Sequence, residues 1–391
     1  MQKLILEFVD EDYSAYTLAP LLVKFMREFL GLESLLEANL TIKKRYSTFS
    51  VGKLAFLGIL FIMLGIERFS HLSNKWIRET GLAKVNRLKS FPRKTTFADF
   101  LNSFSGYHTE QLKRVHRELV RQNREYWLPP RGPYFIDIDL NTKSVEGKKI
   151  QSAALGYNRK RQGRMCLQWS RGLFCGIPFW SKLFSGNKNS KQTLREDLIW
   201  LKQEIASYAP HTLAQLVVRL DGGYWSPELL KSLDLPWLIH GPMLKCLGMD
   251  ELIKDSKTKW QSYSKTTEFF DLGRRNVGKE LEARVLLVKQ VERSQKSFSK
   301  KPKYIYYALM TSLTHWSAKA IIKGYRGRQV IENHFKETNQ AFFSNKLPSG
   351  KLRANEAFLW FVTFAYTIST FFKRSTYANL LGPDELQKLS T

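Results

Sequence analysis

The first third of the chain has the hydrophobic spacing of packed helices. From residue 18 to about residue 123, apolar residues recur three and four positions apart and strand-like alternation is scarce. Residues 96–99 have the T-x-x-D form of a capping box, which predicts a short helix over residues 97–104. Gly106 is expected to break this helix, and a second, basic helix is expected to start at Thr109. The pattern is compatible with a DNA-binding helix-turn-helix and equally with a packed helical hairpin.

The pattern changes after two prolines at positions 129 and 130. Residues 134–140 alternate, so that Ile136 and Ile138 fall on one side of a strand and Asp137 and Asp139 on the other. A helical pattern over residues 192–208 follows, and then an apolar run over residues 216–220. Strand, helix, strand is the connection that parallel pairing requires, so an α/β region is predicted.

Strand-like, lysine-rich runs fill residues 240–310 and predict a β-rich insertion. A helix around residues 325–336 and an aromatic helix over residues 355–374 are expected after it. Two apolar stretches, residues 54–65 and 357–372, are shorter than the roughly 20 residues of a membrane-spanning helix, and we expect both to be buried helices.

The composition of the chain limits the classes of function that fit it. The chain has 391 residues and 43% hydrophobic residues, enough for a sizeable core. It has 62 Lys and Arg against 35 Asp and Glu, a net charge of +27, which favours nucleic acid as a partner and an anionic membrane surface less strongly. The three cysteines, Cys166, Cys175 and Cys246, form no C-x-x-C pair, which argues against a zinc ribbon and a disulfide framework and fits a reducing compartment. The N-terminus, interrupted by acids, does not have the pattern of a signal peptide.

One stretch of the chain is strongly basic. Residues 141–190 contain ten Lys or Arg and one acid, with glycines interspersed. Such strands and loops are able to follow a phosphate backbone, and the alternative is a solvated edge hairpin. The candidate DNA contacts here are Arg159, Lys160, Arg161 and Arg164.

Three acids in separate elements suggest a metal site. Asp139 lies on the alternating strand, Asp221 follows the apolar run, and Glu332 lies in a helix between Arg328 and Lys336, on one face with Tyr325 a turn before. A surface ion pair would also explain Glu332. However, phosphodiester cleavage and strand transfer use two Mg²⁺ ions about 3.5–4 Å apart, and such ions prefer carboxylate oxygens.

The surroundings of these acids, in order, resemble those of a known family. They are D-I-D at residues 137–139 followed by Gly147, G-Y-N at 156–158 with G-R at 163–164, R-L-D-G-G-Y at 219–224 with S-P at 226–227, and Y-x-x-R-x-x-x-E at 325–332. The set is similar to the bacterial insertion-sequence transposases of the DDE type, and more narrowly to the branch with a Y-R-E-K signature and a β insertion. The resemblance extends over about residues 18–372.

The resemblance implies an α/β fold with an RNase H-like mixed-sheet core flanked by helices, an inserted β-rich subdomain and an N-terminal all-α region. It implies that Asp139, Asp221 and Glu332 are the catalytic acids and hold two Mg²⁺ ions, for which Mn²⁺ can substitute. Asp137 stays open as an alternative first ligand, with support of the site as its other role. Tyr325 and Arg328 would hold DNA phosphate, although pairing of both with Glu332 on the helix surface is the alternative.

The sequence departs from the family pattern at two places. Asn339 occupies the position of the signature Lys, and Leu140 and Asn141 replace the usual small hydroxyl residues after the first acid. We expect Lys336 to take over the phosphate contact. Trp225 is a candidate for stacking on a base or for core packing, and His334 is expected to be structural or to face DNA.

The implied organisation has four regions: residues 1–128 as a helical DNA-binding region, 129–239 as the first part of the catalytic core, 240–310 as the insertion and 311–391 as the second part of the core. The implied partners are double-stranded DNA with terminal inverted repeats, target DNA and a second copy in a synaptic homodimer, without a membrane. The expected location is the bacterial cytoplasm, associated with the nucleoid. The alternative function is a basic DNA-binding protein without catalysis, either a decayed transposase or a regulator.

Overall fold

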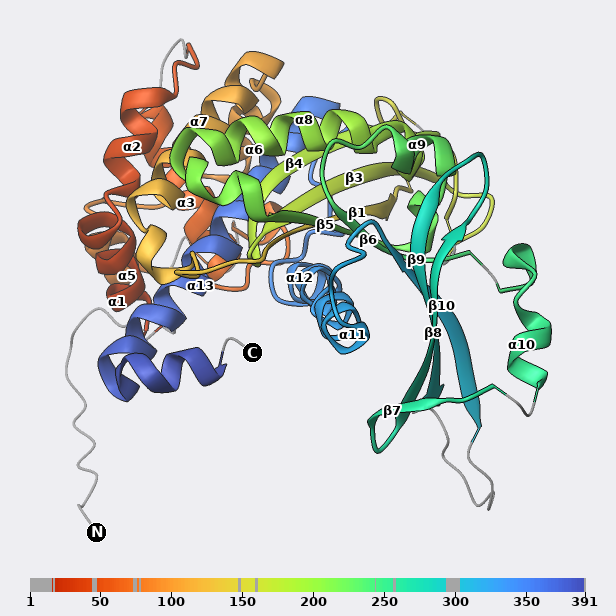
Figure 1. The fold of residues 1–391 in the computed structure, drawn as a ribbon. Helices are drawn as coiled ribbons and strands as arrows, with labels where there is room; N and C mark the ends of the chain where they lie inside the picture. The colour runs from red at the N-terminus through yellow and green to blue at the C-terminus, as the bar shows by residue number, and fades with distance from the viewer. Residues whose placement is uncertain are drawn as a thin grey trace. The chain divides into compact units, whose positions relative to one another are not determined.

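The computed structural model describes residues 16, 18–43, 48–72, 76, 79–146, 149–158, 161–242, 244–255, 258–292 and 303–389 (Figure 1). The chain forms two compact units. We call the first the helical unit; it comprises Met1–Tyr126, Val145–Ser152 and Glu337–Thr391. The second, the sheet unit, comprises Trp127–Ser144 and Ala153–Lys336. The four predicted functional regions stay a prediction.

The helical unit contains a run of short helices and one long one. They are α1 Ala19–Lys24, η1 Phe25–Phe29, α2 Leu32–Asn39, α3 Val51–Met63, η2 Phe69–His71, α5 Thr80–Val85, α6 Lys94–Asn102, α7 Gly106–Gln122, η3 Arg124–Tyr126 and α13 Leu352–Leu389. Helix α12 spans Gln329–Gln340, and its residues from Glu337 onward also belong to this unit.

The two most apolar stretches are buried helices, as predicted. Helix α3 begins at the Ser50 cap, whose side chain accepts a hydrogen bond from the Lys53 amide, and its residues 52–62 are buried. It packs against the apolar part of α13, where Gly58 allows the Phe361 ring to approach closely. Within the described residues, no helix is long and apolar enough to cross a membrane.

The predicted boundary between α6 and α7 is wrong. Helix α6 begins at Lys94 without a side-chain cap, so residues 96–99 lie inside it and form no capping box. Gly106 does not separate two helices but is the first residue of α7, because Ser105 caps this helix together with His108. Helix α7 packs against α2 and α13, and DNA binding by it stays a prediction.

The sheet unit carries all the strands of the described chain. Its elements are β1 Tyr134–Ser144, β2 Ala154–Leu155, β3 Met165–Phe174, β4 Ile177–Ser185, α8 Ser190–Tyr208, η4 Pro210–Gln215, β5 Leu216–Leu220, η5 Gly222–Tyr224, α9 Pro227–Lys231, β6 Trp237–His240, η6 Leu244–Leu247, α10 Asp250–Lys254, β7 Gln261–Ser264, β8 Thr267–Asn276, β9 Glu282–Val291, β10 Tyr304–Thr311, α11 Ala318–Arg326 and most of α12.

These strands form one 10-stranded sheet in the order β2-β3-β1-β5-β6-β10-β9-β8-β7, with β4 paired to β3. Strands β1, β5 and β6 are parallel, and the remaining pairs are antiparallel. An antiparallel β4-β3-β1 meander beside parallel β5 and β6 is the arrangement of an RNase H-like core, which confirms the predicted fold class. The predicted insertion extends the same sheet, because β10 pairs with β6.

Helices cover both faces of the core of the sheet. Helix α8 lies on one face, and α11 and α12 lie on the other (Figure 1). Ile136 and Ile138 of β1 are buried, whereas Asp139, on the opposite side of the strand, contacts Arg328 at the start of α12. The alternation therefore places the strand's two aspartates on one face, as the sequence predicted, and the contact with Arg328 shows that this face is turned toward α12.

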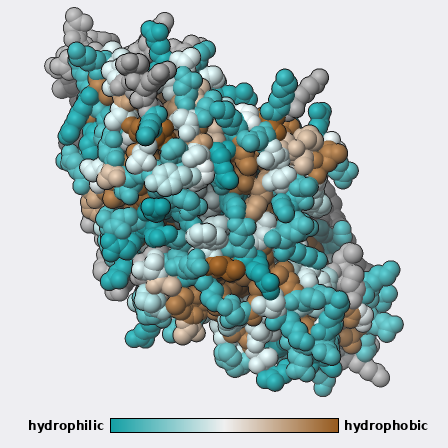
Figure 2. All heavy atoms as spheres, turned by 90° about the horizontal axis from the view of Figure 1, so that it is seen from above, coloured by the Kyte–Doolittle hydropathy of each residue, from teal (hydrophilic) through white to brown (hydrophobic). Residues whose placement is uncertain are grey.

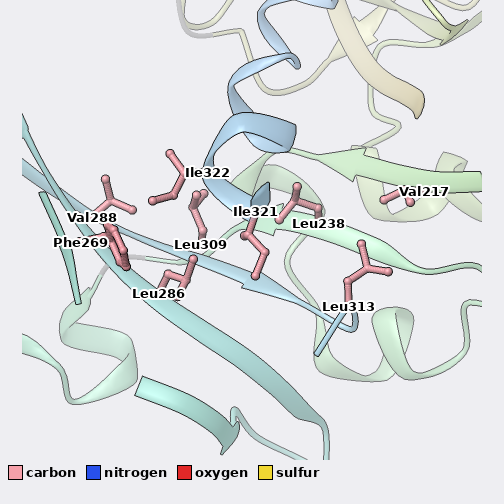
Figure 3. Close-up of a cluster of buried hydrophobic side chains, with 9 residues drawn as sticks. All are labelled: Val217, Leu238, Phe269, Leu286, Val288, Leu309, Leu313, Ile321 and Ile322. Carbon is pink, nitrogen blue, oxygen red and sulfur yellow. The ribbon is translucent and has the colours of Figure 1, made fainter. Parts of the chain in front are cut away.

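A buried hydrophobic cluster fixes α11 to the sheet. Ile321 and Ile322 of α11 pack on apolar side chains from five strands, seen together in Figure 3: Val217, Leu238, Phe269, Leu286, Val288 and Leu309, with Leu313 beside them. Burial of large aliphatic side chains contributes about 1.5–3 kcal/mol each, so the position of α11 is well determined. Because α12 follows directly, the cluster also positions the start of α12. Elsewhere, hydrophilic residues cover most of the face in Figure 2.

Candidate active site

The three predicted acids meet at one guanidinium. Arg328 Nη2 lies 3.1 Å from Asp139 Oδ2 and 3.9 Å from Asp221 Oδ2. Arg328 Nη1 lies 3.2 Å from Glu332 Oε1. Side chains from β1, the end of β5 and α12 are therefore brought together, although their residues are far apart in the sequence.

The strand register explains the first two positions. β1 and β5 are parallel neighbours, and Asp137 is paired with Arg219. Asp139 and Asp221 are each two residues further along, so they lie side by side on the same face. Asp221 also caps the short helix η5, since its side chain accepts a hydrogen bond of 3.0 Å from the Gly223 amide. This bond orients the Asp221 carboxylate.

The Arg328 guanidinium is buried, whereas the side chains of the three acids are partly exposed to solvent. The side chain of Arg328 is 5% exposed, and those of Asp139, Asp221 and Glu332 are 19%, 40% and 55% exposed. Burial raises the pKa of Asp139 to about 6; the charge of Asp221 adds to this rise, and Arg328 opposes it. Burial alone would lower the pKa of Arg328, but Asp139 and Asp221 raise it above its ordinary value. The guanidinium is therefore a permanent positive charge among these acids.

The donor set suits a hard divalent cation. Three carboxylates supply oxygen ligands of the kind that Mg²⁺ and Mn²⁺ prefer, and one guanidinium offsets only part of their charge. Within the described residues, no three or more His, Cys, Asp or Glu side chains form a ready-made metal site. The acids contact Arg328 instead.

Asp137, the alternative first ligand, is engaged elsewhere. It is fully buried and accepts two hydrogen bonds from Arg219, of 2.7 Å from Nε and 2.6 Å from Nη2. Arg219 Nη1 donates to the Gly324 carbonyl at 2.7 Å, and its guanidinium stacks 4.1 Å from the centre of the Phe135 ring. Asp137 and Arg219 thus tie the end of α11 to two strands beside the three acids.

This pair was not foreseen from the sequence, although a signal existed. Asp137 and Arg219 are separated by 82 residues, the same spacing as Asp139 and Asp221 (221 − 139 = 82). Two pairs of residues with the same sequence separation share one register when their strands are parallel neighbours. The predicted proximity of Asp139 and Asp221 therefore implied that Asp137 and Arg219 are also neighbours. Gly327 completes the arrangement, because an added Cβ there would lie 2.2 Å from Arg219 Nη1.

The signature residues around the acids have different surroundings. Tyr325 is half-buried; burial raises its pKa, Arg328 opposes this rise, and the charges of Asp221 and Glu332 add to it. Lys336 is exposed on α12. Asn339, in the position of the signature Lys, accepts a hydrogen bond of 2.7 Å from the Ser344 hydroxyl. Trp225 is half-buried beside η5.

The basic stretch is divided between interior and surface. Arg171 and Lys143 are buried beside the Trp169 ring, 4.7 and 4.5 Å from its centre, and so do not line a phosphate path. Arg171 Nε donates a hydrogen bond of 3.0 Å to His334 Nε2. His334 is fully buried, and burial lowers its pKa well below the usual value, so of its two predicted roles the structural one is observed.

Two of the four basic DNA-binding candidates can be located. Arg161 and Arg164 are exposed in the turn before β3. Arg159 and Lys160 lie outside the described residues. Among the cysteines, Cys166 is buried and Cys175 is half-buried.

Comparison with known proteins identifies the family. A search of curated proteins found no match. The family model described as transposase DDE domain group 1 matches residues 19–387. The match covers nearly all of the chain and agrees with the predicted family, while the narrower Y-R-E-K branch stays a prediction. The chain therefore belongs to the family of transposases with a DDE domain of group 1.

Proposed function

We propose that this protein is a DNA transposase that binds the terminal inverted repeats of an insertion sequence and catalyses metal-dependent DNA strand cleavage and strand transfer. The observation that carries the proposal is the convergence of Asp139, Asp221 and Glu332 on one guanidinium. Membership of the transposase family supports the same chemistry.

In this proposal, Asp139, Asp221 and Glu332 hold two Mg²⁺ ions, for which Mn²⁺ can substitute. When bound, the ions activate the attacking oxygen and stabilise the leaving oxygen of the phosphodiester. The carboxylates sit on a strand, at a strand end and on a helix, each fixed by the packing described above. Rigid elements of this kind hold a reacting phosphate in a defined position.

The neighbouring residues position the DNA. Arg328 would bind a phosphate through its planar fork, and the half-buried Tyr325, three residues before it, would contact the same phosphate. Lys336 would supply the phosphate contact that Asn339 cannot make, because an amide carries no charge. These contacts fix the register of the backbone without reading the base sequence.

A wider surface would hold the rest of the substrate. Arg161 and Arg164, with Arg159 and Lys160, would contact phosphates away from the acids, and Trp225 would stack on an unpaired base. A net charge of +27 favours the binding of double-stranded end DNA and target DNA. The need to hold two ends together implies a homodimer in the synaptic complex, acting on the bacterial chromosome in the cytoplasm.

The test is cleavage of a labelled duplex that carries the element's terminal repeat. The wild-type protein is expected to cut it with Mg²⁺ or Mn²⁺, and Asp221→Asn or Glu332→Gln to cut it at least about a hundredfold more slowly, the scale of losing an electrostatic stabiliser. Glu337→Gln, the same chemical change in the same helix, is the control and should leave cleavage unchanged. Undiminished cleavage by either acid variant contradicts the assignment.

The rival function predicts a different result in the same assay. A DNA-binding protein without catalysis would bind the duplex in a salt-sensitive manner and cut it with neither metal. The uncharged Asn339 in the signature position is the observation that favours this rival.

A further inference from the structure

Arg328 is a built-in counter-ion for the acids. Its guanidinium contacts a carboxylate oxygen from each of Asp139, Asp221 and Glu332, at 3.1, 3.9 and 3.2 Å. Its side chain is only 5% exposed, so solvent screens these contacts weakly. In the absence of metal the acids therefore already hold a cation.

A divalent ion between the two aspartates would meet this cation directly. Arg328 Nη2 lies near both Asp139 Oδ2 and Asp221 Oδ2, which belong to two of the carboxylates that would hold a metal. A positive charge a few ångströms from a divalent ion is strongly repulsive in a partly buried site. The guanidinium must therefore withdraw before a metal occupies this position.

After withdrawal, the Arg328 guanidinium has N–H groups available for another acceptor. Within the described residues, Nε and Nη2 of Arg328 have no hydrogen-bond partner, although Nη2 is within ion-pair distance of the aspartates. Nη1 donates to Glu332, whose side chain is 55% exposed and thus lies toward solvent. Unused N–H groups of a guanidinium match the oxygens of a phosphate.

We propose that Arg328 excludes divalent metal from Asp139 and Asp221 until a DNA phosphate takes over its guanidinium, so that metal loading and DNA binding are coupled. The inference rests on the proposed function of the same acids. By linkage, DNA must tighten metal binding by the same factor by which metal tightens DNA binding. A protein without DNA would then load metal poorly.

The chain offers a matched control two residues away. Arg326 carries the same charge, but its Nη2 donates to the Thr267 hydroxyl at 2.6 Å and its guanidinium lies 4.7 Å from the centre of the Tyr263 ring. Replacing it removes one positive charge from the same turn without touching the acids. Any difference between the two variants therefore reflects position and not net charge.

The experiment is a calorimetric Mn²⁺ titration of the full chain, with and without a duplex oligonucleotide. Without DNA, Arg328→Gln is expected to bind Mn²⁺ at least about tenfold more tightly than wild type, which is about 1.4 kcal/mol. Arg328→Lys, which keeps the charge, and Arg326→Gln are expected to stay within about threefold of wild type, since neither removes the cation beside the acids. DNA is expected to tighten Mn²⁺ binding in wild type and not in Arg328→Gln.

The outcomes separate this inference from the function on which it rests. Equal or weaker Mn²⁺ binding by Arg328→Gln, while Asp221→Asn abolishes binding, overturns the inference and leaves the metal site standing. Mn²⁺ binding that is absent from wild type and from Arg328→Gln overturns both. If Arg328→Gln is less stable, the rise in Tm caused by Mn²⁺ is compared instead, and a rise no larger than that of wild type also overturns the inference.

Discussion

Replacing Asp137 tests how the site is supported. Asp137 is fully buried and its partner Arg219 is 6% exposed. The pair is joined by two charge-assisted hydrogen bonds of 2.6 and 2.7 Å, and Arg219 also holds the Gly324 carbonyl. Asp137→Ala would leave a buried guanidinium without its counter-ion.

The expected loss is large. Removing one partner of a buried ion pair costs about 3–5 kcal/mol, because the remaining charge is left uncompensated. In a domain of about 200 residues, each kcal/mol lowers Tm by about 2–4 °C, so a fall of roughly 6–20 °C is expected for the sheet unit. Thermal unfolding followed by circular dichroism and calorimetry measures it.

Asp139→Ala is the matched comparison on the same strand face. Asp139 is partly open to solvent, and Arg328 keeps Asp221 and Glu332 as partners when the Asp139 carboxylate is removed. This variant should lose DNA cleavage while its Tm falls by much less than that of Asp137→Ala, since Arg328 keeps two acidic partners and no buried charge is left uncompensated. An Asp137→Ala protein as stable as wild type, or an Asp139→Ala protein destabilised as strongly as Asp137→Ala, would refute this division of roles.

Two further predictions concern the sheet unit. Burial raises the pKa of Asp197 to about 7, against hydrogen bonds from Ser170 and Trp180 that lower it. The folded state therefore retains a proton that the unfolded state loses near pH 4, so this contribution to stability is complete below about pH 4 and is lost as the pH rises through about 7. Between pH 5 and 7, the free energy of unfolding measured with urea is expected to decline with rising pH, and Asp197→Asn should make this decline smaller by up to about 1.4 kcal/mol per pH unit. A slope equal to that of wild type would contradict this prediction. Gly186→Ala should cost about 1–3 kcal/mol in the same assay, because its Cβ would lie 2.1 Å from the Cys166 carbonyl oxygen; full stability would show that the backbone relaxes without cost.

Local patterns predicted the elements that carry the acids. Alternation in residues 134–140 gave the face of Asp137 and Asp139, and the apolar run before Asp221 gave a buried strand, because both depend only on neighbouring residues. The start of α7 was missed for a local reason as well, since the helix was predicted to start at Thr109, whereas Ser105 caps it four residues earlier through its contact with His108. Propensity alone does not decide between two adjacent caps.

The partners of the charged residues depended on tertiary structure. Arg328 was expected to hold phosphate or to pair with Glu332, and the second of these contacts is observed. Its contacts with Asp139 and Asp221 were not predicted, because they require β1, β5 and α12 to be placed together. The burial of Arg171 inside a basic stretch was missed for the same reason, since net charge does not show which cations are covered.

The most direct test of the central claim is to locate Mn²⁺ by anomalous diffraction in a crystal of the full chain bound to terminal-repeat DNA. The account predicts anomalous peaks within coordination distance of carboxylate oxygens of Asp139, Asp221 and Glu332, with Arg328 turned toward a phosphate. Peaks at other residues, or a protein that cuts this DNA with no ion at the three acids, would contradict it.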